Sequence, residues 1–265
     1  MLSGKGLDCG YDGSGVVVGI IDSGVDFNHL AFRDSNGHTR IERVYLPAAA
    51  NGNNPVVDGD TLPGRDYVTP EQIESLTTDD SSLSHGTHTT GIAAGSDVLK
   101  YGGMAPKASL MVVAMPQNDI NEVNIACGAK YIASWAKKMG KPCVINISMG
   151  NHDGPHDGSG LMARVFDNLT REYGCVFVLS AGNEGNTMIY VNKQFTASDK
   201  VLSSVMRTSA QSEFDIDAWS RGQAPLTISY SVVNTSSGEI VAKGGAITCD
   251  SVVNFKNDEA FSAYV

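Results

Sequence analysis

Short apolar runs alternate with longer amphipathic segments over roughly the first two thirds of the chain. The run at residues 16–21 is almost continuously apolar, which is typical of a strand buried on both faces of a parallel sheet. Further apolar runs predict strands at residues 108–114, 143–147 and 175–179. Helices are predicted at residues 120–139 and 161–173, and after Ser84 as far as Gly95. Because strand and helix alternate, we predict an α/β fold with a doubly wound parallel sheet.

Two other parts of the chain follow different patterns. Residues 33–82 are polar and rich in loop-forming residues, so we expect a long irregular connection that serves as surface. Beyond Gly185, apolar and polar residues alternate at 214–218 and 226–232, and a turn at 235–238 leads into 239–243. This alternation predicts antiparallel hairpins. We therefore expect an α/β domain at residues 1–200 and an incomplete β-rich segment at residues 201–265.

The composition excludes several classes of function. The net charge is −10, whereas a nucleic-acid-binding protein needs clustered Lys and Arg for phosphate contacts. No apolar run approaches the ~20 residues that span a bilayer. The first ten residues do not resemble a signal peptide. The five cysteines include no C-x-x-C pair, which leaves a zinc-ribbon or thioredoxin-like site unsupported. We expect neither a nucleic-acid partner nor a membrane span.

Three polar residues stand directly beside the predicted strands and helices. Asp22 follows the strand at 16–21, Asn183 lies just past the strand at 175–179, and His85 opens the small-residue helix. Because the carboxyl ends of parallel strands meet at one edge of the sheet, folding can bring the three together. A carboxylate can orient an imidazole, the imidazole can take a proton from a hydroxyl, and a carboxamide can stabilise an oxyanion. The set therefore fits acyl transfer.

The segments that carry these residues resemble a known family. VGIIDSGVD at residues 18–26, HGTHTTG at 85–91 and SAGNEG at 180–185 are similar to three of the four signature blocks of the subtilisin-like serine proteases, or subtilases. GMAP at 103–106 and VINISMG at 144–150 add support, so the resemblance covers roughly residues 10–190. It implies a subtilisin-like, three-layer α/β/α fold and a serine endopeptidase that acts on polypeptide substrates.

The resemblance also implies a role for individual residues. Asp22 would be the orienting acid, His85 the general base and Asn183 the oxyanion donor, while His88 would be structural. Two tripeptides would contact substrate: Ser148, Met149 and Gly150 along an extended backbone, and Ser180, Ala181 and Gly182 beside the primary specificity pocket. The chemistry requires no cofactor. Family habit favours export, to the extracellular space or the cell envelope.

The sequence departs from the family pattern at the nucleophile. The family's nucleophile is the serine of a Gly-Thr-Ser-Met-Ala block downstream of the asparagine, and no such block follows Asn183. The serines there lack a preceding Gly-Thr: Ser203, Ser204, Ser209, Ser220 and Ser229. The β-rich stretch resembles an insert that some bacterial subtilases carry before the nucleophile. We therefore expect a fragment that is inactive alone, with the missing C-terminal portion as a second fragment or as further chain.

Two alternatives stay open at this point. A pseudoprotease or binding scaffold with the same fold would also lack a nucleophile, although the intact set of Asp22, His85 and Asn183 argues against it. A metal site is the other alternative. The loop at 151–157 offers His and Asp, but on a Gly/Pro-rich segment that is more typical of a surface or cleft rim. The acidic loops are compatible with a structural calcium ion, with these candidate ligands: Asp58, Asp60, Asp79 and Asp80.

Overall fold

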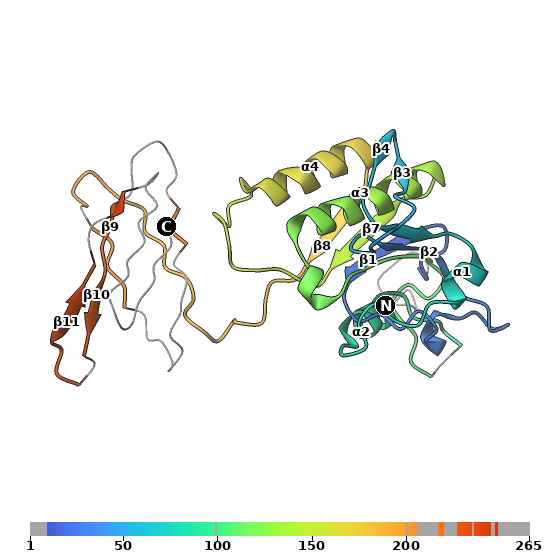
Figure 1. Ribbon diagram of the computed structural model, residues 1–265, viewed down its shortest axis with the longest axis horizontal. Coiled ribbons are helices and arrows are strands. Elements are labelled where there is room, and N and C mark those ends of the chain that lie inside the picture. The colour runs from blue at the N-terminus through green and yellow to red at the C-terminus, as the bar shows by residue number, and fades with distance from the viewer. Residues whose placement is uncertain are drawn as a thin grey trace. The chain divides into compact units, whose positions relative to one another are not determined.

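The computed structural model describes residues 10–98, 100–199, 201–205, 217–219, 227–234, 236–244 and 247–248. The chain packs as two compact units (Figure 1). The first comprises residues 1–151 and 159–182, and the second comprises 152–158 and 183–265. Packing units need not coincide with domains of the sequence, so the expected division at residue 200 stays a prediction.

A six-stranded sheet forms the centre of the first unit, with the strand order β5-β2-β6-β1-β7-β8. The strands are β1 (Val17–Asp22), β2 (Ile41–Leu46), β5 (Arg65–Tyr67), β6 (Ser109–Ala114), β7 (Cys143–Ile147) and β8 (Val176–Leu179). Five of them are mutually parallel, and β5 pairs antiparallel with β2 at the edge. The four strands predicted from apolar runs are confirmed, and they occupy the centre and one edge of this sheet.

Helices cover the sheet on both sides, as Figure 1 shows. They are α1 (Pro70–Glu74), α2 (His85–Ala94), α3 (Glu122–Lys138) and α4 (Leu161–Tyr173), with short 3-10 turns at Leu30–Phe32 and Gln117–Asp119. Side chains of β1 alternate between two hydrophobic clusters: Val17 and Ile21 face the α3 side, and Val18 and Ile20 face the α2 side. The architecture is therefore a three-layer α/β/α fold.

Two glycines let α3 lie close to the sheet. A Cβ atom at Gly19 of β1 would stand 2.6 Å from Ile132 Cγ2, and one at Gly128 of α3 would stand 2.7 Å from Val113 Cγ1. Larger residues at either position would push the helix away from the sheet and open gaps in a close-packed core. This contact keeps the central strands, and the residues at their carboxyl ends, in fixed positions.

The expectation of an irregular connection at residues 33–82 is wrong in its central part. That stretch contains β2, which lies between β5 and β6 inside the sheet, together with β5, α1 and a small hairpin of β3 (Val56–Val57) and β4 (Asp60–Thr61). Glu42 and Arg43 interrupt the apolar run of β2, and this made its pattern resemble surface. Arg43 is accommodated because its guanidinium stacks over the Trp135 ring, 3.5 Å from the centroid.

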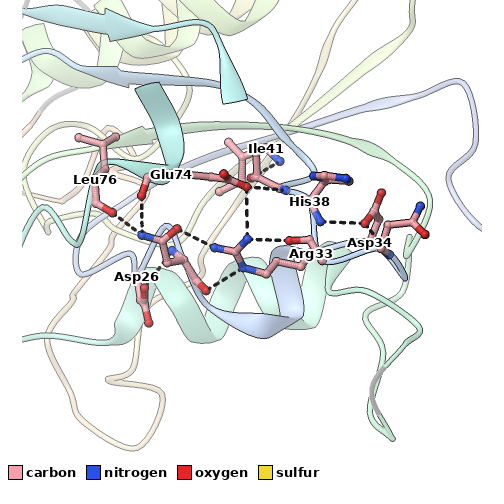
Figure 2. Close-up of polar contacts among 11 residues, drawn as sticks. Asp26, Arg33, Asp34, His38, Ile41, Glu74 and Leu76 are labelled. Carbon is pink, nitrogen blue, oxygen red and sulfur yellow. Dashed lines mark hydrogen bonds and ion pairs between the residues drawn. The ribbon is translucent and has the colours of Figure 1, made fainter. Parts of the chain in front are cut away.

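The loop after β1 is tied to α1 by a polar network around Arg33 (Figure 2). The Arg33 guanidinium donates to the carbonyl of Gly37 (2.7 Å) and to Glu74 Oε1 (3.3 Å). It also donates to Asn28 Oδ1 (2.8 Å), and the Asn28 amide in turn donates to the carbonyls of Glu74 and Leu76. These bonds hold the chain that leaves Asp22 in a single path toward β2.

One antiparallel hairpin, as the alternation predicted, and a second antiparallel strand pair occur in the second unit. β10 (Ser231–Val233) pairs with β11 (Ile240–Lys243), and β9 (Thr227–Ile228) pairs with β12 (Ile247–Thr248). The stretch expected as one strand at 226–232 is thus divided between two partners. The alternating residues 214–216 lie outside the described part of the chain. No helix among the described residues is long and apolar enough to cross a membrane.

Candidate active site

Asp22 and His85 meet at the carboxyl edge of the sheet. Asp22 is the last residue of β1 and is 1% exposed, and His85 is the first residue of α2. The Nδ1 atom of His85 lies 2.7 Å from Asp22 Oδ1. The amide of Ser23 donates to the same oxygen, also at 2.7 Å. The structure thus brings together two of the three residues on which the chemical prediction rests.

Backbone contacts set the position of α2 against the end of β1. The helix begins after Ser84, as predicted, and Ser84 is the N-cap residue, but its side chain makes no capping hydrogen bond. Instead the amide of Gly86 donates to the Ser23 carbonyl (2.7 Å), and the amide of Thr87 donates to the Gly24 carbonyl (3.1 Å). These bonds satisfy two of the amide groups that a helix start leaves unpaired. They also place the His85 side chain over the Asp22 carboxylate.

A second carboxylate supports the turn that follows Asp22. Asp79 accepts hydrogen bonds from the amides of Gly24 (2.9 Å) and Val25 (2.6 Å). Burial raises the pKa of the Asp79 carboxyl above its ordinary value, and the two amide donors act in the opposite direction. Sequence reasoning considered Asp79 only as a calcium ligand. Its structural role was not predictable, because it depends on contacts with residues more than 50 positions away.

The geometry gives His85 a defined proton arrangement. An ionised carboxylate only accepts hydrogen bonds, so the hydrogen of the neutral ring lies on Nδ1, toward Asp22. Nε2 then carries the free lone pair. The side chain of His85 is 53% exposed whereas that of Asp22 is 1% exposed. The ring can therefore accept a proton from a group that approaches from solvent, while Asp22 stabilises the resulting imidazolium.

The six residues expected to contact substrate lie at the same edge. In the sheet register Ile21 of β1 pairs with Ile147 of β7, and Ile147 pairs with Leu179 of β8. The segments that follow β7 and β8 therefore leave the sheet beside each other, and the Ser180 amide donates to the Ile147 carbonyl (3.2 Å). These segments contain Ser148, Met149 and Gly150, and Ser180, Ala181 and Gly182, all partly or fully exposed. Their role in substrate binding stays a prediction.

Comparison with known proteins identifies the family. The model of the subtilase family matches residues 13–262. The chain belongs to the subtilase family. Thermitase from Thermoactinomyces vulgaris is 31% identical over 180 residues, which are 66% of this subtilase chain and 50% of thermitase. The minor extracellular protease Vpr of Bacillus subtilis (strain 168) is 28% identical over 180 residues, 67% of this chain and 19% of Vpr.

A solved structure supports the same assignment. The structure of the Clostridium perfringens CspB protease is 31% identical, with a TM-score of 0.54, and the match covers 66% of this subtilase chain and 37% of that chain. This chain thus spans half or less of the length of each of these relatives.

Asn183 of the subtilase chain belongs to the second packing unit, whereas Asp22 and His85 belong to the first. The amide of Asn183 donates to Glu184 Oε2 (2.9 Å). Glu184 also lies 3.5 Å from the Nε2 atom of His152, a member of the loop weighed as a metal site. The assignment of Asn183 as oxyanion donor stays a prediction.

The acidic residues considered for calcium are engaged with protein groups in this subtilase. Asp58 accepts from the Tyr173 hydroxyl (2.9 Å) and pairs with Lys138 (3.3 Å), and Asp60 pairs with Lys130. Asp79 binds backbone amides, and Asp80 accepts from the amide and hydroxyl of Ser82. Within the described ranges, no three His, Cys, Asp or Glu residues gather as a metal site. These four carboxylates all have protein partners, and the expectation of a structural calcium ion stays a prediction.

Proposed function

We propose that this chain supplies the acid and the base of a serine endopeptidase that hydrolyses peptide bonds. Asp22 holds the His85 ring in the Nδ1–H form, and Nε2 takes the proton from a serine hydroxyl as that serine attacks the peptide carbonyl. His85 then returns the proton to the leaving amine, and water releases the acyl group. The observation that carries the proposal is the 2.7 Å bond between Nδ1 and a buried carboxylate, with the ring otherwise open to solvent.

The substrate is proposed to lie across the carboxyl edge of the sheet. An extended polypeptide along Ser148–Gly150 would pair with backbone groups of that segment, and the residues at 180–182 would flank the side chain before the scissile bond. The side-chain carboxamide of Asn183 is the proposed donor to the oxyanion of the reaction. The exposure of both segments, beside each other at the edge where Asp22 and His85 meet, supports this placement.

The nucleophile is proposed to come from polypeptide other than these 265 residues, so that the chain alone is inactive. No serine of the sequence follows Gly-Thr. The exposed apolar side chains of Val176 and Val178 on β8 are consistent with further polypeptide that packs on this part of the sheet. The word "extracellular" in the name of Vpr supports the proposal that the whole protein is exported.

An active-site label tests this proposal. A fluorophosphonate probe reacts with a serine only where a base activates it, so the 265-residue chain should stay unlabelled. A longer product of the same gene that includes a Gly-Thr-Ser block should be labelled stoichiometrically, and His85→Gln should abolish that labelling. Labelling of the 265-residue chain that His85→Gln removes would place the nucleophile inside it. A gene that encodes no Gly-Thr-Ser block in this or a partner chain would favour the binding scaffold.

A further inference from the structure

The hydroxyl of Thr89 contacts Asp22 of the candidate catalytic pair, and the mechanism proposed above assigns this contact no role. Thr89 lies four residues after His85 on α2, so both side chains project from the same face of the helix. Its Oγ1 atom lies 2.7 Å from Asp22 Oδ2. The other carboxylate oxygen, Oδ1, receives the bonds from Ser23 and His85. Among the described residues, Thr89 is therefore the one recorded donor to Oδ2.

The hydroxyl has a competing acceptor, and the distances decide between them. A helical threonine commonly donates to a carbonyl one turn earlier, and the carbonyl of Gly86 lies 3.2 Å from Oγ1. A hydroxyl has a single hydrogen to donate. Hydrogen bonds from a hydroxyl to an ionised acceptor are shorter, about 2.5–2.7 Å, and about twice as strong as neutral ones. The 2.7 Å contact with Asp22 is thus the bond that the hydrogen makes.

We propose that Thr89 is a positioning residue that fixes the plane of the Asp22 carboxylate and thereby the orientation and tautomer of the His85 ring. A carboxylate with donors on one oxygen can turn about its Cβ–Cγ bond, whereas donors on both oxygens define its plane. Since Asp22 is 1% exposed, water does not readily replace a missing donor. Loss of the Thr89 hydroxyl lets the carboxylate turn and weakens the alignment of Oδ1 with Nδ1–H.

The next residue in the helix supplies a matched control. Thr90 is fully buried, and its hydroxyl has no hydrogen-bond partner among the described residues. Thr90→Val therefore makes the same chemical change one position away without removing a bond to Asp22. Thr89→Val removes the bond, and Thr89→Ser keeps the hydroxyl.

The test reads the His85 ring directly, by NMR of chains with ¹⁵N-labelled histidine, at a pH where the ring is neutral. Loss of the His85 signals in His85→Gln assigns them. Thr89→Val should lower the ratio of the Nδ1–H to the Nε2–H tautomer by about fivefold, the factor that one ordinary hydrogen bond contributes. Thr89→Ser and Thr90→Val should keep the ratio of the unaltered chain. Thermal unfolding of every variant checks that it is folded, and Thr89→Ala replaces Thr89→Val if the valine variant is not.

An unchanged ratio in the folded variant without the hydroxyl would overturn the proposal, as would an equal change in Thr90→Val. The inference rests on the proposed function in one respect: the orientation of the ring matters for catalysis because His85 is proposed to be the general base. The ring is measured without substrate or nucleophile, so a failure here is distinct from a failure of the protease proposal, which the labelling experiment reports.

Discussion

β1 and β8 are apolar strands of the same sheet, but they differ in how much of their surface is covered. All six residues of β1 are buried. In β8 three of the four residues are largely exposed: Val176 (56%), Val178 (47%) and Leu179 (54%). β1 lies between β6 and β7, whereas β8 pairs only with β7 among the described strands. Both strands have apolar sequences, but among the described residues only β1 has all of its side chains buried.

Two of the exposed residues of β8, Val176 and Val178, lie on one face of the strand, whereas Leu179 lies on the other. Val176 and Val178 pair in register with Val144 and Asn146 of β7, which continue the face that α2 covers at β1. On the opposite face Phe177 of β8 packs against Phe166 of α4, with ring centroids 4.6 Å apart. Among the described residues, the difference between the strands is thus clearest on the α2 side, where Val176 and Val178 stay exposed. At β1 that side is covered by α2, the helix that also carries His85.

The largest expected effect comes from separating α2 from β1. A Cβ atom at Gly86 would stand 2.5 Å from Val25 Cγ2 and 2.9 Å from the Ser23 carbonyl oxygen. Gly86→Ala should lower the free energy of unfolding by about 3 kcal/mol, because the backbone must shift. Gly91→Ala in the same helix meets nothing within 4 Å and should raise it by up to about 1 kcal/mol through helix propensity. Urea denaturation measures both, and destabilisation of equal size would refute the close contact.

A matched pair of valines measures the difference between the strands directly. Val17 of β1 is 0% exposed and Val176 of β8 is 56% exposed. Val17→Ala should cost about 2 kcal/mol of unfolding free energy, from lost transfer energy and an unfilled cavity. Val176→Ala should change it by no more than about 0.5 kcal/mol. In a longer chain that covers β8, the cost at Val176 should approach the cost at Val17, and equal costs in the present chain would contradict the exposure of β8.

Sequence patterning predicted the strands whose apolar runs are uninterrupted and the helices with regular apolar spacing. It missed β2, because Glu42 and Arg43 break the run and Arg43 is accommodated by a contact with Trp135, far away in sequence. The pattern also could not show that the side chains of Val176, Val178 and Leu179 on β8 stay exposed, since an apolar run reports what a strand can bury and not what packs against it.

Asp22 and His85 were predictable because each directly adjoins a regular element, and their motifs are similar to those of a known family. The roles of Thr89 and Asp79 were not predictable, although Thr89 contacts Asp22 and Asp79 contacts the turn that follows it. The Thr89 hydroxyl could equally have bonded to its own helix, and only the approach of α2 to β1 decides the matter. Asp79 lies in a polar loop whose composition gives no sign that it binds the turn after β1.

The smallest effect we predict is the pH dependence of the stability that Asp79 contributes at the turn after β1. The pKa of Asp79 is raised above its ordinary value of 3.8 by burial, so the folded state favours the protonated form. The contribution of Asp79 to stability is therefore full below that ordinary value and is lost as the pH rises through the raised pKa. Asn does not titrate. The stability difference between the unaltered chain and Asp79→Asn should thus shrink from acid to neutral pH.

The neighbouring residue provides a control of opposite sign. Hydrogen bonds from Ser82 lower the pKa of Asp80, so its contribution is present above 3.8 and is lost as the pH falls through the lowered pKa. The stability difference for Asp80→Asn should therefore grow from acid to neutral pH, by a small amount because Asp80 belongs to a solvent-exposed turn. Urea denaturation of the three proteins across this range measures both trends. If the difference for Asp79→Asn also grew with pH, burial would not be the dominant influence on Asp79, and its two amide donors would outweigh it.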